Sequence, residues 1–336
     1  MTSRSMPRRR FLTIAAASAA FGAAMTRTAL ATAAGEVPLR RWRGTSLGAA
    51  AEILLYHPDQ AEADRLIRLS LAEVARLEQV FSLYKENSAL SVLNRQGELG
   101  DPPFDLVRLL AQSQHFGALT GGAFDVTVQP LWRLYDDHFR GPDADPDGPP
   151  ASAIAAARRF VDYRDILVEA DGVAFKRPGM AVTLNGIAQG YITDRIADLL
   201  AQNGLEHVLV DLDEFRALGP RADGTPWPVG IEDPRRPGRT VKTVELADGA
   251  MGTSGGYSTQ FDPAGRFNHI FDPGTGGCAD RYQSVSLIAP LGATADGLST
   301  AFSVMPPDRI DAVVKTLRTV TAIIVTKDGS LTTIAA

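Results

Sequence analysis

Residues 252–300 constrain most strongly what this chain can fold into, because they concentrate reactive side chains on short elements. The stretch holds a hydroxyl pair on a glycine turn, an imidazole on a predicted strand, and a carboxylate and a hydroxyl four residues apart. These groups lie in the segments Gly252–Tyr257, His269–Gly276 and Ala295–Thr300. A fold that brings the three segments together would suit a diphosphate bound with a hard metal ion.

A β-hairpin is predicted in the middle of this stretch. Two β-prone runs, Tyr257–Phe261 and Phe267–Phe271, flank Asp262–Gly265, where proline at the second position and glycine at the fourth favour a type I turn. His269 shares one strand face with two phenylalanines, since strand side chains alternate. Its imidazole could act as a general base, because its ordinary pKa is near neutrality. A hydrogen-bonded strand histidine is the alternative, which the residues alone favour.

Asp296 and Thr300 are spaced four residues apart. If Thr294 caps a helix, both side-chain oxygens fall on one face of its first turns. A carboxylate and a hydroxyl suit Mg²⁺, which takes oxygen ligands and keeps several waters or phosphate oxygens. A carboxylate that only caps the helix start is the alternative, and the spacing alone favours it.

Thr253 and Ser254 precede a glycine near a turn, where hydroxyls and flexible backbone amides can cradle a phosphate. Residues Gly252–Gly256 also match the G-x-S-x-G pattern of serine hydrolases. That pattern requires a strand, a sharp turn and then a helix, whereas a hairpin is predicted after Ser254. The only later histidine is His269, which follows very soon. The serine-hydrolase hypothesis is therefore disfavoured.

Composition excludes several classes of protein. The chain has 336 residues, enough for one large domain or two modest ones, and an ordinary 45% hydrophobic content. Net charge is −5, and without the five arginines of residues 1–33 the remainder carries 29 basic and 39 acidic residues, a net of −10. An acidic body argues against nucleic-acid binding. Cys278 is the only cysteine, which excludes an internal disulfide, a cysteine zinc site and an iron–sulfur cluster.

The N-terminus predicts an export signal. Arg8-Arg9-Arg10-Phe11-Leu12 precedes an alanine-rich apolar run that ends near Ala24, and small-residue cleavage candidates follow at 29–33. We interpret residues 1–33 as a twin-arginine signal, with one domain over residues 34–336 and a periplasmic location. A membrane anchor is the alternative, which the shortness of the apolar run disfavours.

Helical and strand patterns mix along the rest of the chain and predict an α+β fold. Apolar spacing predicts helices over about 59–79, 104–119, 151–160, 192–204 and 308–317, besides the one at Thr294. Strands are predicted at 52–56, 166–169, 173–176, 208–212, 227–232, 243–246, 321–326 and 330–334, and Ala123–Val128 has an extended pattern. Residues 136–150, rich in Asp, Pro and Gly, predict an exposed loop.

Taken together and in this order, the motifs resemble the ApbE family of FAD:protein FMN transferases. The likeness covers nearly the whole chain from about Leu47. The segments that carry it are Leu47–Ala49, Phe81–Tyr84 with Ser88 and Leu93-Asn94, Gly122–Thr127 with Pro130–Trp132, Asn185–Tyr191 with Asp194, Gly224–Asp233, Thr253–Tyr257, His269–Gly276 and Ala295–Thr300. The resemblance implies a compact fold of mixed or antiparallel sheets flanked by helices.

The resemblance also implies a reaction and the residues for it. Mg²⁺ would be held by the backbone carbonyl of Ala188 and the side chains of Asp296 and Thr300, and would grip the pyrophosphate of FAD, the substrate. A threonine hydroxyl of an exported or membrane-bound acceptor flavoprotein would take FMN, with His269 as the base and AMP as the leaving group. The implied flavin contacts are Leu47, Tyr84, Ala123, Phe124, Asp125, Thr183, Gln189, Thr253, Ser254 and Ile270.

Four departures from the family pattern stand out. Leu47-Gly48-Ala49 replaces Met-Gly-Thr, Thr183 replaces an aspartate, Gln189 replaces a lysine, and Asp213-Glu214-Phe215 replaces Gly-Gly-Asp. Since the metal pair and His269 are intact, we expect an active enzyme. An FAD pyrophosphatase and a non-catalytic flavin-binding assembly factor are the alternatives. Labelling of a threonine-bearing protein and release of AMP separate the three.

Overall fold

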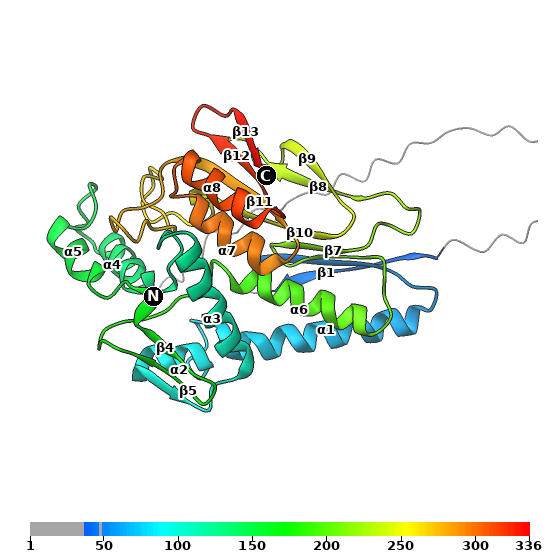
Figure 1. Ribbon diagram of the computed structural model, residues 1–336, viewed down its shortest axis with the longest axis horizontal. Coiled ribbons are helices and arrows are strands. Elements are labelled where there is room, and N and C mark those ends of the chain that lie inside the picture. Colours follow the sequence, from blue (N-terminus) through cyan, green and yellow to red (C-terminus); the bar gives the residue numbers. More distant parts are fainter. Residues whose placement is uncertain (1–36, 47–48) are drawn as a thin grey trace, which may run out of the picture.

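An eight-stranded antiparallel sheet forms the centre of the protein (Figure 1). The computed structural model describes residues 37–46 and 49–336. The strands follow the order β1-β2-β6-β7-β10-β11-β12-β13. Their bounds are β1 Leu39–Ser46, β2 Ala49–Tyr56, β6 Val208–Asp211, β7 Phe215–Leu218, β10 Gly249–Ser254, β11 Tyr282–Ala289, β12 Thr321–Thr326 and β13 Leu331–Ala335. The predicted α+β class with antiparallel sheets is confirmed.

The two faces of this sheet have different coverings, because side chains alternate along each strand. On β2, Ile53 and Leu55 are buried against the helices, whereas Leu54 belongs to a second apolar cluster on the opposite face. That second face is covered by a separate two-stranded sheet, β8 (Trp227–Glu232) paired with β9 (Thr240–Leu246). The sheet is therefore buried on both faces, which holds its strands in a fixed register.

Four helices pack on the first face: α1 (Gln60–Phe81), α6 (Ala188–Gln202), α7 (Gly292–Phe302) and α8 (Pro307–Leu317). Helices α6 and α7 meet through glycines. A Cβ on Gly190 would lie 2.2 Å from the carbonyl oxygen of Gly292, so no larger residue fits there. This close contact fixes the start of α6 against the start of α7.

Two smaller units flank the main body. One contains α2 (Ala89–Gln96), α3 (Phe104–Leu119) and the three-stranded sheet of β3 (Glu98–Gly100), β5 (Gly172–Phe175) and β4 (Ile166–Val168). The other, which we call the aromatic lobe, contains α4 (Gln129–Arg140), α5 (Ala151–Arg158) and residues 259–280. Its helices lie at one end of the molecule in Figure 1. The lobe has its own apolar core around Leu131, Tyr135 and Phe271.

The predicted hairpin is present as its turn and a short antiparallel pairing, which does not extend over the full predicted strands. The backbone amide of Gly265 donates to the carbonyl of Asp262 at 3.1 Å, which closes the turn. The flanking runs pair through a bridge between Gln260 and Asn268. The amide of Phe261 donates to the carbonyl of Phe267 at 2.9 Å, and that of His269 to the carbonyl of Thr259 at 3.2 Å. The first run also contains a 3₁₀ turn, η3 (Gly256–Ser258). Three phenylalanines from these runs pack around the ring of Tyr135 in the aromatic lobe, instead of alternating across a sheet.

Other differences have local causes. Residues 123–128 are not extended, since the side chain of Asp125 caps a short 3₁₀ helix, η1 (Val126–Val128). The predicted loop at 136–150 begins only at Gly141, because α4 continues to Arg140, and Pro149 is buried. Helices α2 and α4 had not been predicted, whereas α3 and β12 have the predicted bounds.

The predicted twin-arginine signal at residues 1–33 lies outside the described residues. Within the part of the chain that the structure describes, no helix combines the length and apolar character that crossing a membrane requires.

Candidate active site

A pocket of about 590 Å³ lies where α6, α7 and β10 face the aromatic lobe and the β8–β9 connection. It brings together the three segments of residues 252–300 that carry reactive groups, since Thr253, Ser254, His269, Asp296 and Thr300 all line it. Its size is that of a site for a small molecule or cofactor.

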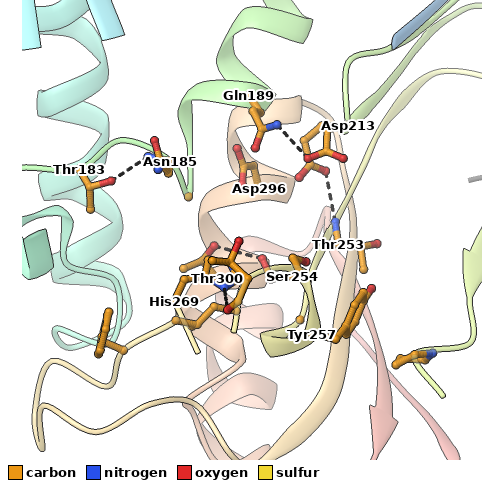
Figure 2. A pocket seen from close by; sticks show the side chains of 18 of the residues that line it. Thr183, Asn185, Gln189, Asp213, Thr253, Ser254, Tyr257, His269, Asp296 and Thr300 are labelled. Carbon is orange, nitrogen blue, oxygen red and sulfur yellow. Dashed lines mark hydrogen bonds between the residues drawn. The ribbon is translucent and has the colours of Figure 1, made fainter. Parts of the chain in front are cut away.

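Asp296 and Thr300 lie one turn apart on α7 and both face the pocket (Figure 2). The helix begins at Gly292, so Thr294 is inside it and the predicted Thr294 cap is wrong. The cap comes from another helix: the carboxylate of Asp194 on α6 accepts from the amides of Gly292 at 2.7 Å and Ala293 at 3.0 Å. Asp296 is therefore not needed to cap the helix start.

Hydrogen bonds fix the side-chain oxygens of Asp296 and Thr300. The Asp296 carboxylate, 3% exposed, accepts from the amide of Gly190 at 3.0 Å. The Ser254 hydroxyl lies 3.1 Å from that of Thr300 and 2.8 Å from that of Ser299. A Cβ on Gly186 would lie 3.0 Å from the Thr300 hydroxyl oxygen, so glycine leaves room beside it. These contacts connect β10, α7 and the start of α6 beside the pocket.

Glu214 places a second buried carboxylate beside this group. Its Oε2 accepts from the amide of Thr253 at 3.2 Å and would lie 2.7 Å from a Cβ on Gly252. Burial raises the pKa of Glu214 well above its ordinary value, and the negative charges of Asp296 and Asp213 add to the effect. Carboxylates this close repel each other unless a proton or a cation lies between them.

The charged side chains of the pocket lining are predominantly acidic. Among the described residues, the lining contains no lysine or arginine. It contains six carboxylates, those of Asp125, Asp213, Glu214, Glu232, Asp233 and Asp296. A phosphate ligand would meet no positively charged side chain here, other than a protonated His269, so its negative charge would have to be offset by a cation bound with it.

His269 belongs to another wall of the pocket, formed by the loop of the aromatic lobe. It is half-buried, and its Nδ1 lies 3.2 Å from the backbone carbonyl oxygen of Thr259. When Nδ1 carries the proton and donates to this carbonyl, the basic lone pair is on Nε2. His269 and Thr300 both line the pocket, and Figure 2 shows them in the same region of the view. The structure therefore brings the imidazole and the α7 pair to one pocket, as the sequence predicted.

Most of the predicted flavin contacts also line the pocket, namely Tyr84, Ala123, Phe124, Asp125, Thr183, Gln189, Thr253, Ser254 and Ile270. Their surroundings differ. Tyr84 is 76% exposed, so its ring presents an open face. The carboxylate of Asp125 accepts from the amides of Thr127 and Tyr163, which occupies it within the protein. Ala188 is buried and is not part of the lining, and Leu47 lies outside the described residues.

Gln189 and Thr183, which replace charged residues of the family pattern, each form a hydrogen bond in this structure. Gln189 donates to the carboxylate of Asp213 at 2.9 Å, so the amide and the unexpected aspartate form a pair. Asp213 has φ +82, a backbone conformation that favours glycine, and it stands where the family pattern has a glycine. The hydroxyl of Thr183 accepts from the amide of Asn185 at 3.3 Å.

Sequence reasoning missed the pocket roles of Asp213 and Glu214, which it treated only as departures from a pattern. The signal that could have found them is their position in a turn directly after the buried strand β6, where strand ends commonly carry site residues. Glu232, at the end of β8, was likewise part of a predicted strand and of no predicted site.

The chain is similar to known proteins over most of its length. The profile of the ApbE family matches residues 47–324. The chain is 34% identical over 280 residues to an FAD:protein FMN transferase of Vibrio cholerae, covering 80% of each protein. One of Treponema pallidum is 32% identical, with 78% of each covered.

Solved structures are similar to this chain as well. A flavin transferase ApbE from Vibrio cholerae aligns with a TM-score of 0.75 and 29% identity, over 89% of this chain and 98% of the other. An ApbE protein from Thermotoga maritima aligns with a TM-score of 0.78 and 28% identity, over 88% and 96%.

Proposed function

This chain belongs to the ApbE family, and from that premise we propose that it is an FAD:protein FMN transferase that works with Mg²⁺. It transfers FMN from FAD to the hydroxyl of a threonine on an acceptor flavoprotein and releases AMP.

One observation carries the proposal: a pocket of cofactor size whose described lining has six carboxylates and neither lysine nor arginine. The FAD pyrophosphate is an anion, so this pocket can hold it only together with a cation. No three His, Cys, Asp or Glu side chains of the described residues form a metal cage. A pocket with few protein ligands suits Mg²⁺, because Mg²⁺ binds through one or two carboxylates and completes its shell with substrate phosphates and water.

The residues that would hold the ion are Asp296 and Thr300, with the backbone carbonyl of Ala188 at the start of α6. When bound, Mg²⁺ would offset charge on the pyrophosphate and on the leaving AMP. Ser254 keeps the Thr300 hydroxyl in place through its 3.1 Å contact. The Gly190 amide orients the Asp296 carboxylate.

His269 supplies the proton-accepting group. The acceptor threonine oxygen forms a bond to the FMN phosphorus, the bond from that phosphorus to the AMP oxygen breaks, and the threonine proton passes to the imidazole. Orientation of the reacting groups supplies much of the acceleration in such a transfer. Tyr84, with its open ring face, offers a surface on which a flavin ring can stack.

We further propose that the protein works in the periplasm after twin-arginine export, on a membrane-associated electron-transfer flavoprotein. The support is the arginine and alanine pattern of residues 1–33. Export of a folded chain would deliver the pocket already formed.

The test is incubation of the purified protein with FAD, Mg²⁺ and candidate exported flavoproteins. AMP release is followed by chromatography, and protein-bound flavin by in-gel fluorescence. Both signals together support the transferase. AMP release without labelling of any acceptor would instead indicate an FAD pyrophosphatase, and absence of both would leave a flavin-binding protein.

A further inference from the structure

The connection between β8 and β9, residues 233–239, forms one edge of the pocket and carries three arginines within five residues. Asp233, Pro234 and Pro237 line the pocket. Arg235, Arg236 and Arg239 are exposed to solvent. The connection therefore has an inner side in the pocket and a basic outer side, in a protein that is acidic overall.

The connection is held in a fixed shape. Its ends are joined by the amide of Asp233, which donates to the carbonyl of Arg239 at 2.7 Å. Two further amides, of Arg236 and Arg239, donate to carbonyls three residues earlier, each at 3.0 Å. Arg235 is anchored from its side chain to the carbonyls of Lys327 and Asp328 in the β12–β13 turn. A surface that is already ordered loses less entropy when it binds a partner.

The acidic residues of the connection do not neutralise its arginines. The carboxylate of Asp233 accepts from the backbone amide of Arg235 at 2.9 Å, and that of Glu232 accepts from the amide of Gly238 at 2.6 Å. Neither Arg236 nor Arg239 forms an ion pair with another residue that the structure describes. By contrast, exposed arginines such as Arg65 and Arg164 pair with neighbouring carboxylates at 2.6 and 2.7 Å.

We propose that Arg236 and Arg239 form a docking surface for carboxylate side chains that flank the target threonine of the acceptor protein. This inference rests on the proposed function. The two side chains are not part of the pocket lining, although Pro234 and Pro237 beside them are. A small ligand inside the pocket would therefore not need them, whereas a protein segment that inserts a threonine across this edge would pass over them. Opposite charge at the rim of an interface speeds association and selects the partner.

The inference is tested on the full-length protein with two synthetic, fluorescein-labelled peptides. Each has one central threonine, flanked by aspartates in one peptide and by asparagines in the other. Fluorescence anisotropy at low ionic strength gives both affinities. Each exposed charge pair contributes modestly, so we expect the aspartate peptide to bind about three- to tenfold tighter. The preference should shrink as salt is raised, because exposed charges are screened.

The double variant Arg236→Glu/Arg239→Glu should abolish the preference for the aspartate peptide. The double variant Arg236→Gln/Arg239→Gln should reduce this preference without reversing the charge. Arg68→Glu on the exposed side of α1 is the matched control and should keep it. Equal binding of the two peptides to the unaltered protein, or a preference that survives both double variants, would overturn the inference. So would a loss of FAD affinity in these variants with peptide preference intact, since the arginines would then serve the FAD phosphates.

AMP release from FAD and Mg²⁺ is measured in parallel. Normal AMP release with no peptide preference defeats this inference alone, whereas a peptide preference without any AMP release defeats the proposed function alone.

Discussion

On one wall of the pocket the reactive groups stand on regular, tightly packed elements, and on the other wall the imidazole stands on an irregular loop. The first wall is α6, α7 and β10, where Gly190 and Gly292 touch and Asp296 is 3% exposed. On the second wall, the loop of His269 contains no regular strand and is supported by the core of the aromatic lobe. There the Tyr135 and Phe271 rings lie 5.2 Å apart.

The two walls of the pocket therefore have different roles. Backbone contacts between helices fix the oxygens of the first wall, so changes there should affect both the fold and the binding of FAD. The second wall has its own core, so the imidazole can be removed while the FAD site stays in place. The following predictions test this division, from the largest expected effect to the smallest.

Asp296→Asn should lower AMP release by about 10³-fold, because the variant keeps the shape of the side chain but loses the charge that a divalent cation needs. Turnover of FAD at saturating Mg²⁺ measures the effect. Asp308→Asn, an exposed position on α8, is the control and should keep full activity. An Asp296→Asn protein with ordinary turnover would remove the first wall from the mechanism.

His269→Ala should lower FMN transfer by about 10²-fold, within the usual range for loss of a general base. FAD affinity should stay unchanged, since the oxygens of the first wall are untouched. A time course of FMN transfer measures the transfer rate, and titration with FAD measures the affinity separately. His115→Ala, exposed on α3, serves as the control. If His269→Ala weakened FAD binding as much as transfer, the two walls would not be separable.

Gly190→Ala should destabilise the protein by about 3 kcal/mol, because the added methyl group would lie 2.2 Å from the carbonyl oxygen of Gly292 and force the helices apart. Gly172→Ala is the matched control, since no atom lies within 4 Å of its added Cβ. Thermal unfolding followed by circular dichroism gives the comparison. Equal melting temperatures for the two variants would show that the α6–α7 contact does not fix the first wall.

The capping carboxylate of α7 should give a smaller, pH-dependent effect. Burial raises the pKa of Asp194 from 3.8 to about 6, against the opposing backbone hydrogen bonds from Ala293 and Gly292. A raised folded-state pKa means that the contribution of this group to stability is fully present below its unfolded pKa. That contribution is lost as the pH rises through about 6.

Asp194→Asn removes this titration. Between about pH 4 and pH 7 the unfolding free energy of the variant should therefore rise relative to that of the unaltered protein. Urea unfolding across this range measures the difference. Parallel curves would mean that Asp194 does not titrate as its burial requires.

The sequence predicted the first wall better than the second. The spacing of Asp296 and Thr300 needs only a helix, and α7 supplies it, so local periodicity was sufficient. The cap was missed because Asp194 comes from another helix, and no local pattern reports such a contact. The hairpin around His269 was predicted with longer strands than it has, because Phe261, Phe267 and Phe271 pack on Tyr135, far away in the sequence.

The carboxylates of the site show the same limit. Asp213 and Glu214 follow a buried strand, but the sequence does not say that the turn after β6 packs beside β10 and α7. Their place in the pocket depends on the sheet order, in which β7 lies between β6 and β10. Motif positions were therefore predictable, whereas the electrostatic character of the pocket was not.

The central claim is that a divalent cation stands in for the positive side chains that the pocket lining lacks. Calorimetric titration of FAD into the full-length protein, once with Mg²⁺ and once with EDTA, tests it most directly. We predict that Mg²⁺ tightens FAD binding by about 10²-fold, and that Asp296→Asn removes the difference. FAD that binds equally well in EDTA would contradict the claim.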